Sequence, residues 1–208
     1  MNLDSLKQKI NHNPGLKSFV HKMIFSNARP RWWVKHVLNA LVFKQGKGSV
    51  IRRQSVINVS PINKFYLGEN STIEEYCVID NGVGDVIIGN ETRVGLRNTV
   101  IGPVHIGNHV ILAQNIVLSG LNHNYEDVSK PIHLQGINTK PIVIEDDAWV
   151  GANSVITAGV KIGQHSIIGA GSVVTKSIPP FCIAVGNPAR IIKKFNPDSG
   201  LWEKIDKP

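Results

Sequence analysis

One histidine in this chain is a candidate for proton transfer. His123 lies in the segment LNHNY, residues 121–125. An imidazole with an ordinary pKa of about 6.5 can accept a proton from a hydroxyl group as that group attacks an electrophilic carbon, which typically raises a rate by about 10²–10⁴. A loop histidine such as His123 can therefore act as a general base, and the alternative is an ordinary loop residue. Glu126 and Asp127 are near enough in the chain to orient it, but each is equally an ordinary loop acid, and the sequence leaves both alternatives open.

The segments that must position His123 follow a period of six residues. Glycine often follows each repeated aliphatic residue, and a small or β-branched residue often stands four positions after it. In an amphipathic helix, apolar residues would recur every three or four positions. In a half-buried strand they would recur every second position, so neither element explains the pattern. The aliphatic residues form a prelude and two runs: Leu67, Ile73, Ile79; Ile88, Val94, Val100, Ile106, Leu112, Leu118; Ile144, Val150, Ile156, Ile162, Ile168, Val174.

A sustained period of six indicates a triangular coil. One aliphatic residue of each side points into the prism, a small residue fits the corner, and stacked coils satisfy one another's backbone hydrogen bonds. Pro179 and Pro180 follow the last run and are expected to end the coil. A step of nine residues separates Ile79 from Ile88, and the one long interruption, over residues 119–141, includes His123. Because long loops in compact folds are usually functional, we expect this excursion to carry the site.

The segments IGNETRVG, IGNHVILAQN and VGANSVITAGVKIGQHSIIGAGSVVTKSIPP resemble the hexapeptide-repeat acyltransferases, over about residues 65–192. The resemblance implies an all-β solenoid, a left-handed parallel β-helix, in the branch of the maltose, galactoside and capsular-polysaccharide O-acetyltransferases. It also implies acetyl-CoA as acyl donor, a carbohydrate acceptor, no metal, and a homotrimer with active sites between subunits. The catalytic histidine of that family begins the loop that interrupts the repeat, which is the place of His123 in SGLNHNY.

The same resemblance assigns roles on the acceptor side. Asn98 in LRNTVIG matches an asparagine that faces the acceptor sugar, and an amide can both donate to and accept from a hydroxyl. The alternative for Asn98 is a corner residue of the coil. Trp149 in DDAWVGAN matches a position beside the pantetheine arm and the acceptor, with an ordinary surface aromatic as the alternative.

On the donor side, the resemblance assigns five further residues. Ala152 and Ala170, each after a glycine, match positions whose backbone groups bind the extended pantetheine, and their small side chains permit close approach. Thr175, Lys176 and Arg190 match contacts to the nucleotide and its phosphates.

Two other functions are compatible with this kind of repeat. A zinc hydratase of the γ-carbonic-anhydrase type needs three converging imidazoles, and the one close pair here is His105 and His109, at outward positions. A structural β-helix, such as an assembly or ice-binding protein, would have ranks of identical residues and no catalytic excursion. The excursion favours acyl transfer over both. The histidines that no context singles out are His12, His21, His36, His133 and His165.

The N-terminal part is strongly basic. Residues 1–53 contain 11 of the 23 Lys and Arg residues and a single acid, Asp4. Because Trp32 and Trp33 accompany this charge, the segment is expected to cap the open β-helix, to rest on an anionic membrane, or both. No motif for binding nucleic acid accompanies the charge. The two amphipathic helical patterns are Leu16, Phe19, Val20, Met23, Ile24 and, after Pro30, Val34, Val37, Leu38, Leu41, Val42.

The expected organisation is a basic helical segment over 1–48, a β-helix domain over 49–192 with the excursion 119–141, and a C-terminal tail over 193–208. Cys77 and Cys182 lack metal or redox spacing, the polar residues 1–10 lack the core of a signal peptide, and no apolar run reaches the roughly 20 residues of a membrane span. These features predict a cytoplasmic protein, with peripheral contact at the inner membrane face as an option.

The predicted reaction is transfer of an acetyl group from acetyl-CoA to a carbohydrate hydroxyl, with His123 as base. The basic aromatic N-terminus favours a cell-envelope polysaccharide or its precursor as acceptor, with a small free sugar as the alternative. The sequence leaves open the sugar and position acylated, O- against N-acylation, and the length of the acyl chain.

Overall fold

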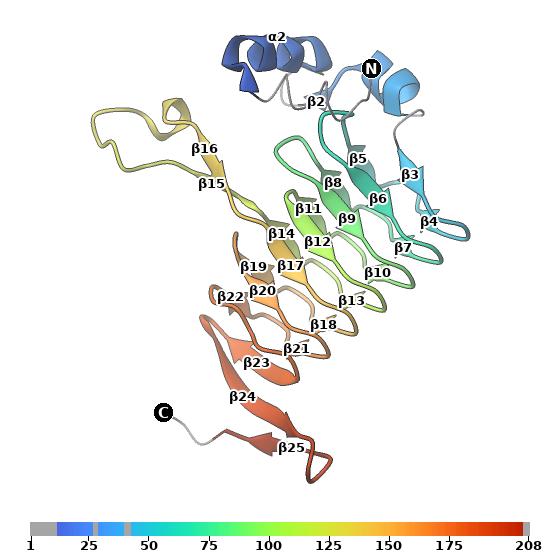
Figure 1. Ribbon diagram of the computed structural model, residues 1–208, viewed down its shortest axis with the longest axis vertical. Coiled ribbons are helices and arrows are strands. Elements are labelled where there is room, and N and C mark those ends of the chain that lie inside the picture. Colours follow the sequence, from blue (N-terminus) through green and yellow to red (C-terminus); the bar gives the residue numbers. More distant parts are fainter. Residues whose placement is uncertain (1–11, 27–28, 40–42, 206–208) are drawn as a thin grey trace.

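The structure, a computed structural model, describes residues 12–26, 29–39 and 43–205, and most of them form a triangular solenoid of parallel strands (Figure 1). Each coil passes through three faces in turn. The first face contains β3 (Lys44–Gln45), β6 (Phe65–Leu67), β9 (Val86–Ile88), β12 (Val104–Ile106), β17 (Ile142–Ile144) and β20 (Lys161–Ile162). The third face contains β5 (Val56–Asn58), β8 (Val78–Asp80), β11 (Thr99–Ile101), β14 (Val117–Ser119), β19 (Val155–Ile156) and β22 (Val173–Val174).

The second face is longer, because two antiparallel strands extend it at the C-terminal end. Its parallel strands are β4 (Val50–Ile51), β7 (Thr72–Ile73), β10 (Arg93–Val94), β13 (Ile111–Leu112), β18 (Trp149–Val150), β21 (Ile167–Ile168) and β23 (Cys182–Gly186). The antiparallel β24 (Ala189–Asn196) and β25 (Leu201–Lys204) then fold back as a hairpin. The solenoid begins at β3, before residue 49, and β24 runs through residue 193, where a tail was expected.

The period of six is confirmed as the core of the protein. All fifteen predicted aliphatic residues are at most 3% exposed, and the corner residues four positions later are equally buried. Stacked strands keep the aliphatic residues in register, as where Val94 pairs with Ile73 on one side and Leu112 on the other. Because every interior position is occupied by a neighbour above and below, each coil fixes the position of the next.

The prediction that Pro179 and Pro180 end the coil is wrong. Ile178 still forms a parallel bridge with Ile162 on the first face, and β23 still pairs with β21 on the second. The prolines are tolerated because no further coil stacks on the first face in the described chain: the equivalent Gly163 donates its N–H to the carbonyl of Ile178 at 2.8 Å, and Pro179 has no such carbonyl to reach. The carbonyl of Pro179 still accepts a hydrogen bond from Ser166 Oγ at 2.8 Å. The parallel coil ends at β23 instead, where the chain reverses into β24.

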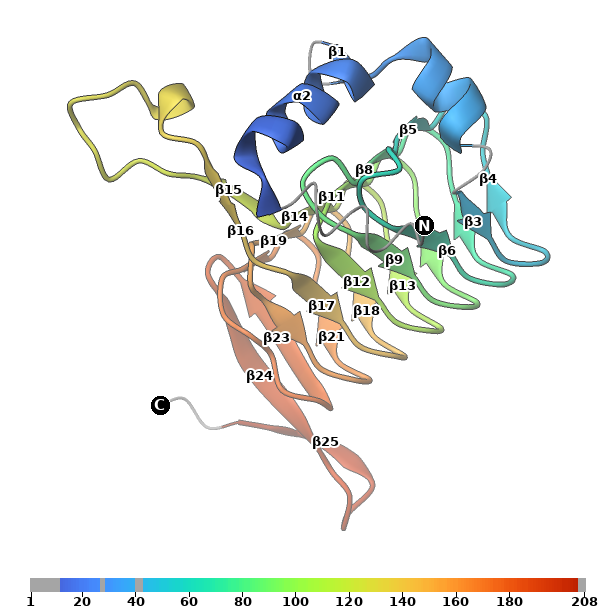
Figure 2. The same cartoon turned by 45° about the horizontal axis from the view of Figure 1, so that its top comes forward.

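The helical N-terminal segment lies over the end of the solenoid that carries β3 to β5 (Figures 1 and 2). It consists of α2 (Pro14–Ile24), the short strands β1 (Phe25–Ser26) and β2 (Arg29–Pro30), and a π-helix (Val34–Leu38). Ile24, Phe25 and Val34 form a small core of their own, and Val20, Leu38 and Ile62 pack against it. The residues 1–10, Leu41 and Val42 of the sequence-based expectations lie outside the described residues.

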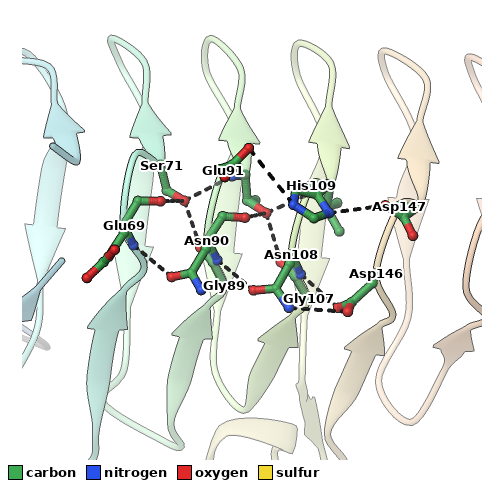
Figure 3. A network of polar contacts seen from close by, with 12 residues as sticks. Glu69, Ser71, Gly89, Asn90, Glu91, Gly107, Asn108, His109, Asp146 and Asp147 are labelled. Carbon is green, nitrogen blue, oxygen red and sulfur yellow. Dashed lines mark hydrogen bonds and ion pairs between the residues drawn. The ribbon is translucent and has the colours of Figure 1, made fainter. Parts of the chain in front are cut away.

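A row of polar side chains ties successive coils together at the edge between the first and second faces (Figure 3). The backbone N–H of Glu69 donates to Asn90 Oδ1 at 2.8 Å, that of Asn90 donates to Asn108 Oδ1 at 2.9 Å, and that of Asn108 donates to Asp146 Oδ1 at 2.8 Å. The last bond joins the coil before the excursion to the coil after it. The solenoid is therefore continuous past the excursion.

We expect Asp146→Ala to lower the free energy of unfolding by about 1–2 kcal/mol, because the N–H of Asn108 at this half-buried edge loses a charged acceptor. The backbone and side-chain hydrogen bonds from Asn108 hold the pKa of Asp146 below its usual range. The carboxylate therefore stabilises the fold above the pH at which an unfolded Asp titrates, near 4, and this contribution is lost as the pH falls through the folded-state pKa.

Urea denaturation of wild type, Asp146→Ala, Asp146→Asn and the hairpin control Asp198→Ala from pH 7 to pH 3 measures these effects. The stability gap between wild type and Asp146→Asn should narrow toward pH 3, and the control should follow the wild type. A gap that is constant over the whole range would contradict the assignment.

Candidate active site

The excursion leaves the solenoid at one corner and returns to the same corner. A side chain on Gly120 would lie 2.5 Å from the carbonyl oxygen of Pro103, so the chain can leave β14 here only with a glycine. The N–H of Gly120 donates to the carbonyl of Ile101, and the N–H of Lys140 donates to the carbonyl of Gly120, both at 2.9 Å. The two ends of the excursion are thus fastened to each other and to the coil below.

Beyond this base, the excursion rises as an antiparallel ribbon that projects from the side of the solenoid (Figures 1 and 2). Strand β15 (Leu121–His123) pairs with β16 (Ile137–Thr139), and His123 stands opposite Ile137. The head of the loop contains a 3₁₀ turn (Ile132–Leu134). The ribbon therefore presents His123 at its outer end, away from the coils.

The imidazole of His123 is exposed, and no side chain or backbone group in the described part of the chain is hydrogen-bonded to it. Glu126 accepts a bond from the N–H of Tyr125 at 3.0 Å. Asp127 is paired with Lys130 at 2.6 Å and accepts from Ser129 at 2.5 Å, and the bond from Lys130 lowers the pKa of Asp127. Within one protomer, both acids are therefore loop residues and neither orients His123.

Asn98 lies inside the solenoid wall and does not face solvent. It is 1% exposed, its Nδ2 donates to the carbonyl of Ala113 at 2.8 Å, and its Oδ1 accepts from the N–H of Ile116 at 2.6 Å. Both ends of the amide are used by the next coil. Within the protomer Asn98 acts as a corner residue that satisfies backbone groups where the chain turns, as the alternative expected, and its contact with the acceptor stays a prediction.

The phosphate-binding candidates Lys176 and Arg190 line one groove of about 910 Å³ at the C-terminal end of the solenoid. Lys193 and Lys204 line it as well, together with the apolar side chains of Ile178, Ile191, Ile192 and Ile205. No acidic side chain is among its lining residues in the described chain. Thr175 is exposed at the corner just before Lys176. The groove therefore suits an elongated anion with an apolar part.

Two of these basic residues, Lys193 and Lys204, fall in the expected C-terminal tail over 193–208. For Lys193 the basic stretch after the last coil left two alternatives, a contribution to the phosphate site or a solvated tail. Lys204 carries no signal in the repeat, because the β24–β25 hairpin that brings it back is antiparallel and has no period of six. A basic stretch after the last coil was the available signal.

Trp149, Ala152 and Ala170 lie elsewhere on the prism. Trp149 is 49% exposed on the second face, between Ile111 and Ile167 in register. Ala152 and Ala170 stand at the corners between the second and third faces, and within the described residues their N–H groups have no hydrogen-bond partner. The equivalent N–H groups of other coils share this feature, so the small side chain is what distinguishes these two positions.

The protomer thus brings Lys176 and Arg190 together but does not join them to His123. The lining of the groove with Lys176 and Arg190 does not include His123, and the cavity in the excursion is lined by excursion residues such as Asn124 and Gln135. The described residues also contain no group of three or more His, Cys, Asp and Glu placed to hold a metal ion. His109, half of the predicted close pair, lies between Asp147 at 3.2 Å and Glu91 at 3.9 Å (Figure 3).

Comparisons with known proteins agree with this architecture. Residues 141–176 match the bacterial transferase hexapeptide (six repeats), and residues 85–119 match the hexapeptide repeat of succinyl-transferase. The galactoside O-acetyltransferase of Escherichia coli K12 is 35% identical over 137 residues, 62% of this chain and 64% of that protein. The chain therefore spans slightly less than two thirds of that relative. The putative lipopolysaccharide biosynthesis O-acetyl transferase WbbJ of the same strain is 33% identical over 147 residues, 66% of this chain and 75% of that protein.

A solved structure shows the same fold. A variant of AntD, an N-acyltransferase from Bacillus cereus, in complex with dTDP-4-amino-4,6-dideoxyglucose and coenzyme A, superposes with a TM-score of 0.65 at 21% identity, over 79% of this chain and 91% of that one. The solenoid is thus a left-handed parallel β-helix built of hexapeptide repeats. The chain belongs to the hexapeptide-repeat acyltransferase family.

Among the described helices, none is long and apolar enough to cross a membrane.

Proposed function

We propose that this protein transfers an acetyl group from acetyl-CoA to a hydroxyl of a carbohydrate, with His123 as the general base. The observation that carries the proposal is the placement of an exposed histidine at the end of the β15–β16 ribbon, which projects from the middle of an acyltransferase solenoid. His123 accepts the hydroxyl proton as the oxygen attacks the thioester carbonyl. As the carbon–sulfur bond breaks, His123 returns that proton to the departing thiolate. No nucleophilic serine or cysteine is needed, because a thioester is already activated.

The donor is proposed to lie with its phosphates in the C-terminal groove. Lys176 and Arg190 supply fixed positive charge there, and Lys193 and Lys204 add to it. Thr175 lies beside Lys176 at the nucleotide end. The unpaired N–H groups of Ala152 and Ala170 suit the amides of an extended pantetheine arm, and Trp149 offers an apolar surface next to it. The absence of acidic lining residues in the described groove fits this polyanion.

A homotrimer with active sites between neighbouring subunits is part of this proposal. The support is that His123 and the basic groove are not joined within one protomer, while the ribbon projects away from its own coils (Figure 1). A second copy would supply the missing half of each site.

The acceptor is proposed to be a cell-envelope polysaccharide or its precursor. The relatives named above include a putative enzyme of lipopolysaccharide biosynthesis and a galactoside O-acetyltransferase, so a free sugar stays as the alternative acceptor. His123 is exposed on a projecting ribbon, a position that a bulky acceptor can reach.

We expect His123→Ala to lower turnover by at least about 10², because the hydroxyl loses its proton acceptor while the binding groups remain. Release of the coenzyme A thiol with the best acceptor from a panel of sugars and envelope glycans measures this. The apparent affinity for acetyl-CoA and the unfolding temperature should stay near those of the wild type. If His123→Ala kept most of the wild-type turnover, His123 would not be the general base.

Neutralising Lys176 or Arg190 to Gln should weaken acetyl-CoA binding more than it slows the chemical step. The phosphates lose a cation in each case, so the wild-type affinity should also weaken with added salt. Calorimetric titration with coenzyme A tests this, with Lys64→Gln, an exposed lysine near the other end of the solenoid, as matched control. If the Lys176→Gln/Arg190→Gln double variant bound coenzyme A like the control, the phosphates would have to bind elsewhere.

We further propose that the N-terminal segment contacts the inner face of an anionic membrane. Phe19 is 60% exposed and Trp32 is 73% exposed, and Leu16, Met23 and Val37 are exposed as well. Residues 12–53 contain nine Lys and Arg and no Asp or Glu. Capping and membrane contact use different residues here, because Val20, Ile24 and Val34 supply the small packed core. Exposed apolar side chains in a segment rich in Lys and Arg suit an interface of anionic lipid.

Wild-type protein should sediment weakly with anionic vesicles at low salt, and Phe19→Ser/Trp32→Ser should lose this binding, because both side chains are exposed in the protein. Substitution is preferable to deletion through residue 45, which would remove β3 from the solenoid. The control Leu201→Ser alters a side chain that is 65% exposed at the opposite end. If wild-type protein stays in the supernatant at low salt, the membrane contact is wrong and the basic segment only caps the β-helix.

A further inference from the structure

The ribbon that carries His123 is a small element. Its strands β15 and β16 have three residues each, and most of their side chains are exposed. A two-stranded ribbon of this size is at best marginally stable by itself. Since no described group holds the imidazole directly, the position of His123 depends on what holds the ribbon together.

The residue after His123 provides that hold. The backbone N–H of Asn124 donates to the carbonyl of Gly136 at 3.1 Å, and its side-chain Nδ2 donates to the carbonyl of Gln135 at 3.1 Å. Its Oδ1 accepts from Asn138 Nδ2 at 2.7 Å. Asn124 therefore grips the opposite strand on both sides of Ile137, the residue that pairs with His123.

The same contact joins the ribbon to the head of the loop. Gln135 Oε1 accepts from the N–H of Asp127 at 3.0 Å, and Gln135 Nε2 donates to the carbonyls of Asp127 and Lys130 at 2.8 and 2.9 Å. The head is thus closed by the side chain of Gln135, while its backbone carbonyl is bound by Asn124. Both amides are half-buried and satisfied within the loop, so they are not free to bind an acceptor.

We propose that Asn124 is a positioning residue for the reaction: its amide clamps the ribbon across Ile137 and thereby fixes where His123 meets the acceptor hydroxyl. This inference rests on the proposed role of His123 as general base. A general base that is displaced by about 1 Å can lose about 10² in rate even when the binding groups are intact. The sequence contains no hint of the clamp, because it depends on which residues face each other across the ribbon.

The test compares Asn124→Ala with Asn122→Ala in the same strand. Asn122 is exposed and pairs with Asn138 only through the backbone register, so it is the matched control. We expect Asn124→Ala to lower kcat by about 10–10² while the KM for acetyl-CoA changes less than about twofold. Adding Asn124→Ala to His123→Ala should cause no further loss, because the clamp acts through His123. Hydrogen exchange should quicken at the amides of the ribbon and leave those of the coils unchanged.

The outcomes separate the inference from the function on which it rests. If His123→Ala keeps its turnover, the proposed function fails. If His123→Ala is inactive but Asn124→Ala matches the control in kcat, only the clamp is overturned. A parallel loss of kcat, acetyl-CoA affinity and unfolding temperature would also overturn the clamp, because it would show general damage to the fold. The clamp would also be overturned if His123→Ala/Asn124→Ala had a lower turnover than His123→Ala alone.

Discussion

The structure depends on one constraint: the backbone N–H and C=O groups of each coil must be in register with those of the next coil, so that the two coils can form hydrogen bonds. Strands of two or three residues cannot form a stable sheet alone, so the ladder between coils supplies the regularity. The buried aliphatic residues then fall into columns, as in the pairing of Leu112 with Val94 and Val150. An insertion is compatible with this ladder only where it leaves and returns at one corner.

The excursion meets this constraint. Although 38 residues separate Asn108 from Asp146, they are bonded as neighbouring coils, and the N–H of Ile142 reaches the carbonyl of Pro103 below the excursion. The coils provide a rigid base, and the ribbon of β15 and β16 carries chemistry that the crowded prism could not accommodate. Asn98 illustrates how the prism uses its own polar side chains: its amide faces into a corner and is hydrogen-bonded to the backbone of the next coil.

Periodicity made a large part of this fold predictable from the sequence. The inward aliphatic residues, the small corner residues and the place of the excursion were all predictable, because the period of six directly reflects the closed coil. Pro179 and Pro180 were misread, since the sequence does not show whether a further coil stacks on the face where a proline falls. The contribution of Lys204 to the groove and the clamp of Asn124 were also beyond the sequence. Both depend on antiparallel contacts whose register local residues do not determine.

Analysis of the product is the sharpest test of acyl transfer to a carbohydrate hydroxyl. The full chain is incubated with acetyl-CoA labelled in its acetyl group and with envelope polysaccharides, free hydroxyl sugars and amino sugars in separate reactions. We expect one thiol to be released for each acetyl group transferred to a glycan, in a linkage that mild alkali and hydroxylamine cleave as an ester. Acetyl recovered only as an alkali-stable amide, or thiol release that no carbohydrate stimulates, would contradict it.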